Sequence, residues 1–312
     1  MNGSESKIEI FKPFGEAFEL TKKILFQPFN FEKWLIIGFA AFLTHLNGGG
    51  FNGFRLPANS DWTKQAFSQP DSVRSFIDQI APVWWILIGV AVLLFIAIFV
   101  VLTWIRSRGH FIFIDCIVRN RAAIVQPWKE YRIEGNSYFI FSLLLLLAII
   151  GLVIVVALMI IVPAVVISRH EYSALAFLPL LLLLIILPVF LLLITLVQFV
   201  APVMYRRRCK AWPAFNDLLS LLAKHLGVFV LYLLFGLVVG VAVAIAIVTA
   251  TCLTCCLAAI PYVGTVIFLP VYVFLQSFSL LFIRQFGPDY DVWAAIPEPT
   301  ATTTSEPPPL PS

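Results

Sequence analysis

Charged residues are scarce in this sequence. Only 12% of its 312 residues are Asp, Glu, Lys or Arg, and 61% are hydrophobic. A soluble domain carries about 25% charged residues, so a water-soluble fold of this size could not cover its surface. The shortage excludes a cytosolic globular enzyme, a disordered chain and a disulfide scaffold. The composition instead predicts a protein solvated largely by lipid.

Ionisable side chains that could carry a charge across a membrane are also missing from the long apolar runs. A spanning helix needs about 17–25 apolar residues, because the hydrocarbon layer is about 30 Å thick. The sequence predicts an all-α bundle of six transmembrane helices within residues 1–286. The predicted spans are residues 34–46, 82–105, 138–167, 174–205, 226–250 and 260–283. The first is short enough to be a re-entrant or interfacial segment instead.

The distribution of basic residues gives an orientation. With six spans, 17 Lys and Arg residues fall on the side of the two termini and 4 on the opposite side. Without the first span the division is 12 against 9. Because short loops rich in Lys and Arg stay in the cytoplasm, we expect six spans with both termini cytoplasmic, in the cell inner membrane. Glutamates among the early lysines lead us to expect no cleaved signal peptide.

Three segments on the basic side combine a proline with aromatic or apolar residues, and each precedes a pair of predicted spans. They begin at Pro13, Pro127 and Pro213. The first places Phe11, Phe14, Phe18 and Leu25 on one helical face, and the third does the same with Trp212, Phe215, Leu219 and Leu222. We expect amphipathic helices that lie in the interface and bind anionic phospholipid headgroups. The alternative is an ordinary cap of packed helices. The recurrence also suggests three repeated units.

No motif supports a catalytic, cofactor or metal site. Gly48, Gly50 and Gly53 match a dinucleotide-binding pattern, but they follow an apolar helix rather than a strand. Cys252, Cys255 and Cys256 form a CxxCC group, read as helix packing with a redox pair as the alternative. Cys116 and Cys209 are isolated. The histidines lie near predicted membrane boundaries, without the neighbours that a metal site requires; they are His45, His110, His170 and His225.

Uncharged polar residues inside the predicted spans are compatible with helix packing, with a transporter or with an enzyme. Gln198, Gln276, Ser277 and Ser279 fit hydrogen bonds between helices, and Pro179, Pro188 and Pro270 predict kinks. A transporter would need a polar cavity reached by Gln198 or Gln276. An enzyme would need at least two of Asp115, His110, Glu130 and His225 in one cleft. Asp115 and Arg119 are spaced for an i,i+4 ion pair if the helix continues beyond the membrane.

The end of the chain has a different composition. Seven of the residues in 287–312 are proline, accompanied by threonines and acids. Such a segment cannot bury a core, so residues 287–312 are predicted to form a disordered cytoplasmic tail.

One stretch carries a resemblance to known proteins. The sequence RGHFIFIDCIVRNRAAIVQPWKEYRIEGNSYFIF, together with the Pro-aromatic segments, resembles uncharacterised bacterial multi-pass proteins. Some of these are similar to the membrane domain of glycerophosphoryl diester phosphodiesterases. The resemblance implies a membrane module, and the chain has no room for the hydrolase domain.

These observations predict a non-enzymatic multi-pass membrane protein, an accessory or scaffold module in envelope or lipid homeostasis. The alternative is a transporter or lipid-handling permease with a cavity between the fourth and sixth predicted spans. The expected partners are the lipid bilayer and a membrane protein or a second copy of the chain, with no nucleic acid.

Overall fold

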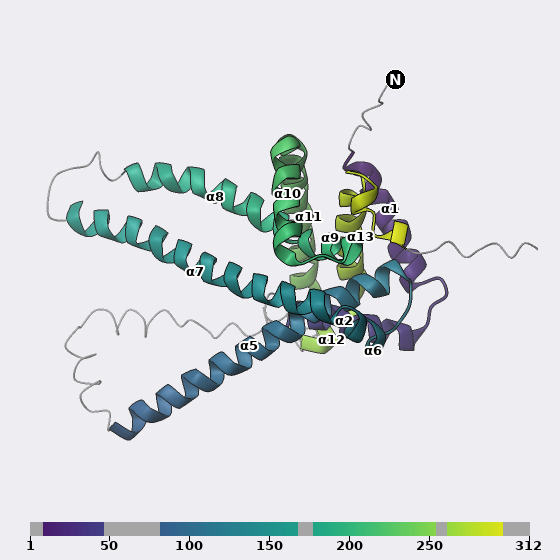
Figure 1. Cartoon of the computed structure of the whole chain (residues 1–312), viewed down its shortest axis with the longest axis horizontal. Coiled ribbons are helices and arrows are strands. Elements are labelled where there is room, and N and C mark those ends of the chain that lie inside the picture. Colours follow the sequence, from purple (N-terminus) through teal and green to yellow (C-terminus); the bar gives the residue numbers. More distant parts are fainter. Residues whose placement is uncertain (1–8, 47–81, 168–176, 254–260, 296–312) are drawn as a thin grey trace, which may run out of the picture.

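The computed structural model describes residues 9–46, 82–167, 177–253 and 261–295, and all regular structure in these ranges is helical (Figure 1). The longest helices are α5 (Pro82–Val118), α7 (Arg132–Ile167), α8 (Phe177–Val197) and α11 (Leu226–Leu253). The shorter ones are α1 (Phe11–Leu25), α2 (Phe31–His45), α6 (Val125–Glu130), α9 (Val200–Arg207), α10 (Ala211–Lys224), α12 (Pro261–Ile267) and α13 (Leu269–Arg284). Two single-turn helices follow, η3 (Pro288–Tyr290) and η4 (Trp293–Ala295).

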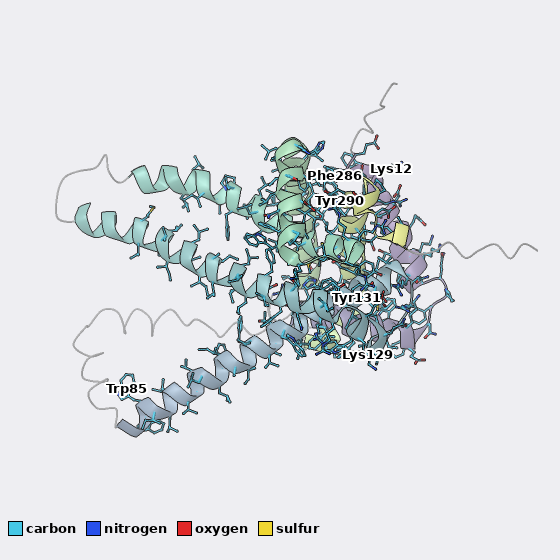
Figure 2. The ribbon with its side chains drawn as sticks, in the orientation of Figure 1. Lys12, Trp85, Lys129, Tyr131, Phe286 and Tyr290 are labelled. Atoms are coloured by element: carbon cyan, nitrogen blue, oxygen red, sulfur yellow. The ribbon has the colours of Figure 1, made fainter. Side chains whose placement is uncertain are left out.

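The molecule has a packed base from which apolar helices project. The base consists of the short helices, the end of α5 from residue 103 and the beginnings of α7 and α11, and it contains the buried core. Helices α5, α7 and α8 extend away from it, with Trp85 near the far end of α5 (Figures 1 and 2). Large side chains there are open to solvent, such as Leu93 at 69% and Phe95 at 70%. So much exposed apolar surface is unsuited to water and suits contact with lipid chains.

Four helices are long and apolar enough to cross a membrane. They are Trp84–Val118, Arg132–Met159, Ile186–Arg207 and Leu226–Leu253. They correspond to the predicted spans 82–105, 138–167, 174–205 and 226–250. The all-α class is therefore confirmed for the described residues, whereas six spans are not.

The first and sixth predicted spans are not among these four, because each is a short or divided helix in the structure, and their crossing of the membrane stays a prediction. Helix α2 has 15 residues, or about 22 Å, which is less than the hydrocarbon thickness. The stretch 260–283 is divided at Phe268 into α12 and α13. Pro270 causes this break, because it has no N–H to donate to the carbonyl of Val266. Trp34 on α2 uses that carbonyl instead, with its indole Nε1 donating to Val266 O at 3.1 Å.

The core of the base is built where α2 lies antiparallel to the end of α5. Lys33, near the start of α2, donates to Asn120 Oδ1 at 2.7 Å, and Arg106 Nε donates to Thr44 O at 3.0 Å. Between these contacts Gly109 faces Leu43 so closely that a Cβ atom at Gly109 would lie 2.7 Å from the Cβ of Leu43. The absence of a side chain at Gly109 therefore lets the two helices approach.

The three Pro-aromatic segments form three helices, each with proline at the same position in its first turn. Pro13, Pro127 and Pro213 are each the third residue of their helix, α1, α6 and α10. The first N–H groups of a helix have no intrahelical acceptor, so proline costs no hydrogen bond at this position. The common placement supports the hypothesis of three repeated units.

Helices α1 and α10 each have a packed face in addition to the apolar face that the sequence predicts for the membrane interface. Helix α1 buries Pro13, Ala17 and Thr21, and leaves Phe11 at 80% and Phe18 at 63% exposed. Helix α10 buries Ala211, Ala214 and Leu218, while Trp212 is 62% exposed. Phe14 and Phe215 are partly buried and pack beside the core, whereas Phe11, Phe18 and Trp212 lie outside. Each helix thus combines a packed face with an aromatic stripe, and whether that stripe enters a membrane interface stays a prediction.

The beginning of the predicted disordered tail is packed against the base. Residues 288–290 and 293–295 form η3 and η4, and Val292 between them is fully buried. The prediction of disorder is therefore wrong for this part. The remaining residues, 296–312, lie outside the described part of the chain.

The contact at Gly109 predicts opposite effects for one substitution at two glycines of α5. Gly109→Ala should destabilise the protein by about 1–3 kcal/mol, because the new methyl group collides with Leu43. Gly89→Ala should stabilise the helix by about 0.5–1 kcal/mol, because nothing lies within 4 Å and alanine favours helix. Denaturant unfolding in detergent measures both. The contact is refuted if Gly109→Ala behaves like Gly89→Ala.

Candidate functional site

The most constrained group in the base is the carboxylate of Asp115, near the end of α5. Its side chain is completely buried. Oδ1 pairs with Arg119 Nε at 3.1 Å and accepts a hydrogen bond from the Tyr205 hydroxyl at 3.0 Å. Oδ2 accepts from Nε and Nη2 of Arg121 at 3.0 and 2.9 Å. This carboxylate therefore has two guanidinium partners and one hydroxyl partner, which compensate for its burial.

The ion pairs continue through a second carboxylate on α6. Arg119 Nη2 reaches Glu130 Oε1 at 3.2 Å, so Arg119 bridges Asp115 and Glu130. Arg208 pairs with the same Glu130 oxygen and lies 3.4 Å from Glu134 Oε1. The resulting network of Asp115, Arg119, Glu130 and Arg208 joins α5, α6 and the end of α9.

Aromatic rings pack beside this network. Tyr131 stacks on Tyr205 with ring centroids 4.8 Å apart, and the Arg208 guanidinium lies 3.9 Å from the centroid of Tyr131. Figure 2 shows Tyr131 within the base. Burial raises the pKa of the Tyr131 phenol. Burial lowers the pKa of Arg119, but Asp115 together with Tyr205 and Glu130 outweighs this and leaves that pKa above its ordinary value. Both groups therefore keep their protonated forms.

Two backbone features bring α9 to the network. Pro202 has no N–H for the carbonyl of Gln198, and the chain is interrupted between α8 and α9 at this point. Arg208 ends α9 in the left-handed region, with φ of 53°. The interruption frees α9 to turn into the base, and the left-handed residue turns the chain toward α10.

A separate group of ion pairs holds the last described residues. Arg207 pairs with Asp217 at 2.6 Å and lies 3.7 Å from Asp289, and Arg284 pairs with Asp291 at 3.1 Å. Arg207 also lies 4.8 Å from the ring centroid of Tyr290. These contacts explain why the segment around η3 and η4 is packed rather than free.

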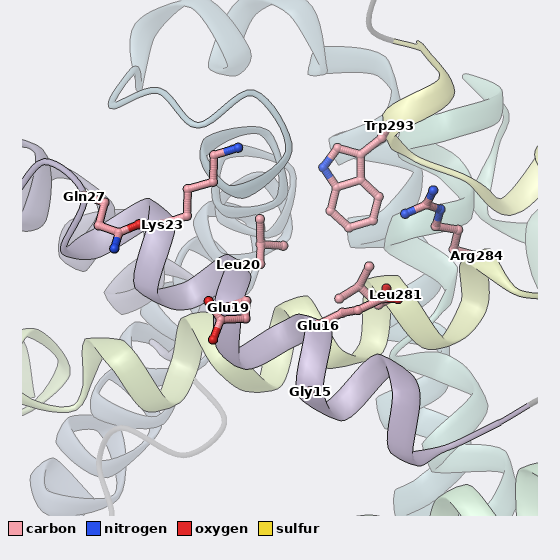
Figure 3. Close-up of a pocket in the computed structure, with 9 residues that line it drawn as sticks. All are labelled: Gly15, Glu16, Glu19, Leu20, Lys23, Gln27, Leu281, Arg284 and Trp293. Atoms are coloured by element: carbon pink, nitrogen blue, oxygen red, sulfur yellow. The ribbon is translucent and has the colours of Figure 1, made fainter.

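Two adjoining grooves lie between α1 and α13. The larger has a volume of about 620 Å³ and the smaller about 350 Å³, and both are lined by Glu16, Leu281 and Arg284. Figure 3 shows Trp293 and Arg284 on one wall of the larger groove, with Glu19 and Lys23 of α1 on the other. Because the walls carry both positive and negative side chains, the grooves favour neither an anionic nor a cationic ligand.

A third cavity, of about 420 Å³, is apolar. Its walls include Phe14, Phe18 and Phe26 beside α1, Val243 on α11, and Pro270 on α13. Neither Gln198 nor Gln276 lines this cavity or the two grooves.

Of the four residues from which an enzyme would need at least two in one cleft, only Asp115 and Glu130 are shown close together. Asp115 and Glu130 are brought together, but through Arg119 and as part of a closed ion-pair network. His110 packs against Tyr138 and His225 against Phe286, each with ring centroids 5.5 Å apart. The arrangement fits the stabilisation of helix contacts better than general acid–base chemistry, because each carboxylate is held by arginine.

The other candidate residues are dispersed. His45 lies against Tyr272 at 4.4 Å between ring centroids. Cys252 is exposed, Cys116 is buried and Cys209 is half-buried. Within the described ranges, no three His, Cys, Asp or Glu residues are placed to hold a metal ion. His170, Cys255, Cys256 and the glycines 48, 50 and 53 lie outside those ranges.

Ser277 and Ser279 of α13 were predicted to form hydrogen bonds between helices, and the described structure shows such a bond for Ser279. The hydroxyls of Ser279 and Tyr232 are 3.0 Å apart, which confirms a hydrogen bond between α13 and α11. Ser277 Oγ is buried and has no partner among the described residues. Sequence reasoning anticipated Ser279 but missed Tyr205 and Arg208, whose partners are distant in the sequence.

Comparisons with known proteins give one match. A family described as "Family of unknown function (DUF7544)" matches residues 9–269. No curated protein and no solved structure matches the chain. The likeness to the membrane domain of glycerophosphoryl diester phosphodiesterases therefore stays a prediction.

The ion-pair network predicts that removing the charge of Asp115 strongly lowers the stability of the protein. Asp115→Asn keeps the shape but removes the charge that compensates Arg119 and Arg121, so the protein should lose about 3 kcal/mol of stability. Asp289→Asn is the matched control, because Asp289 is 78% exposed and 3.7 Å from its arginine. That variant should lose less than about 0.5 kcal/mol. Equal losses in a denaturant titration would show that Asp115 has no special role.

Proposed function

The chain belongs to the DUF7544 family, a family of unknown function, and from this premise we propose a non-catalytic role in the membrane. The protein is a multi-pass membrane module that serves as an accessory or scaffold in envelope or lipid homeostasis. The observation that carries the proposal is the division of the molecule into apolar projecting helices and a base whose buried carboxylate, Asp115, is held by two arginines.

The projecting helices support the membrane part of the proposal. Many of their apolar side chains have no protein to pack against in the described structure, for example Leu147 on α7 and Phe95 on α5 at 58% and 70% exposure. Lipid chains provide an apolar environment for these surfaces, and a helix satisfies its own backbone groups there.

The base supports the non-catalytic part. A general acid or base needs a carboxylate or imidazole that can exchange its proton with a substrate. Asp115, Glu130 and Glu134 are instead neutralised by Arg119, Arg121 and Arg208. This use of charge favours a rigid platform over a reactive site.

The orientation follows from the same division. Basic residues such as Lys12, Lys129 and Lys224 belong to the helices of the base. By the positive-inside rule the base faces the cytoplasm, with both ends of the chain on that side of the inner membrane.

The runner-up function is lipid handling. The apolar cavity beside Phe14, Phe18 and Pro270 favours it, because its volume of about 420 Å³ would receive part of an acyl chain. Reconstituted liposomes distinguish the two functions. The scaffold proposal expects fluorescent lipid to change leaflets no faster than in protein-free liposomes, and faster exchange would favour the permease.

Labelling of single cysteines in intact cells tests the proposed arrangement. In a chain without its natural cysteines, Lys12→Cys, Lys129→Cys and Lys224→Cys should react with a membrane-impermeant maleimide only after permeabilisation. Asn59→Cys, between α2 and α5, should react in intact cells and serves as the control for access. Labelling of any of the three base positions before permeabilisation would overturn the orientation, and release of the protein by alkaline washing would overturn membrane insertion.

A further inference from the structure

A fourth cavity lies where α5, α7 and α8 meet at the edge of the base. Its volume is about 220 Å³. Arg106 and Ser107 of α5 and Tyr138 and Ser142 of α7 supply its polar groups, while Leu145 and Ile149 of α7 supply apolar walls. Figure 1 shows α5 and α7 diverging as they leave the base. The cavity therefore lies at the transition between the charged base and the apolar projections.

The lining changes from polar to apolar along one face of α7. Tyr138, Ser142, Leu145 and Ile149 have spacings of four, three and four residues, which places them on one side of the helix. The polar end lies at the base and the apolar end toward the projecting part. A ligand that matches this gradient has a polar group joined to a hydrocarbon chain.

Arg106 determines the charge of that polar group. It is half-buried, and its Nε donates to Thr44 O at 3.0 Å. Among the described residues, its Nη1 and Nη2 atoms have no hydrogen-bond acceptor and no carboxylate partner. By contrast, five arginines of the base each pair with Asp or Glu; they are Arg119, Arg121, Arg207, Arg208 and Arg284.

We propose that this cavity binds the phosphate group of a membrane phospholipid, with the free edge of the Arg106 guanidinium as its cation. The guanidinium fork matches two phosphate oxygens, and the hydroxyls of Tyr138 and Ser142 are the neighbouring donors. No carboxylate lines the cavity to compete with the anion. The acyl chains extend past Leu145 and Ile149 along α7.

The position of the cavity favours a lipid over free phosphate. Arg106 directly follows the apolar run 82–105 of α5, so it lies at the depth of the headgroups when that run crosses the hydrocarbon. The inference rests on the proposed membrane insertion, since only an inserted protein presents the cavity to lipid.

Native mass spectrometry of the full chain in detergent tests the site with phosphatidylglycerol as the probe. Arg106→Gln should weaken the binding of the first lipid about tenfold, as expected for loss of one charge-assisted contact. Arg132→Gln is the matched control, because it removes the same charge from an exposed position at the start of α7, and it should leave the affinity unchanged. Equal affinities for all three proteins would overturn the proposal, as would an equal loss in both variants.

Three further measurements distinguish the possible outcomes. Ser142→Leu fills the cavity while retaining Arg106 and should also weaken lipid binding, so the proposal remains testable if Arg106→Gln does not fold. Inorganic phosphate is the second probe, and if it displaces the lipid and binds equally well through Arg106, a free-phosphate site replaces the lipid site. Alkaline extraction is measured for each variant, because an inserted protein without lipid preference refutes only the site, whereas release from the membrane refutes the proposed function.

Discussion

Burial of the Asp115 carboxylate is the constraint on which the base depends. A charged group without water is costly unless opposite charges and hydrogen-bond donors surround it. Arg119 and Arg121 come from the same stretch of chain, but Tyr205 comes from α9, 90 residues away. Satisfying one carboxylate therefore brings the ends of α5 and α9 together, and Arg119 extends the link to Glu130 on α6.

Prolines make this convergence compatible with long apolar helices. A continuous helix from α8 through α9 could not change direction, and Pro202 removes the hydrogen bond that would hold it straight. Pro270 has the same effect between α12 and α13, where Trp34 then bonds to the released Val266 carbonyl. The chain can in this way pass from a lipid-facing helix into a closely packed base within a few residues.

The sequence predicted those features that depend on local pattern. Uncharged runs of more than 20 residues identified four helices suited to a membrane, and the spacing of Asp115 and Arg119 identified their ion pair. Hydropathy did not show that the first predicted span would be a helix of only 15 residues or that the sixth would be divided, because composition alone does not locate a helix end. Pro270 and the break at Phe268 account for the division of the sixth.

Features that depend on distant partners were not predictable from a single sequence. The packing of Val292 and its neighbours depends on Arg207 and Arg284, whereas the composition of the tail indicates only disorder. The aromatic residues of α1 were expected to share one face toward the membrane interface, but the sequence alone did not show that Ala17 would be fully buried or that Phe14 would contact Phe274. At the cavity near Arg106, the polar residues Tyr138 and Ser142 are spaced as helix neighbours, but only the fold brings α5 beside them.

A double-mutant cycle between Asp115 and Tyr205 tests the central constraint most directly. Asp115→Ala, Tyr205→Phe and the double variant are compared by denaturant unfolding in detergent. The hydrogen bond to a buried charge predicts a coupling free energy of about 1.5 kcal/mol or more. Additive losses, within about 0.5 kcal/mol, would show that the carboxylate does not join α5 to α9 and would contradict this account of the base.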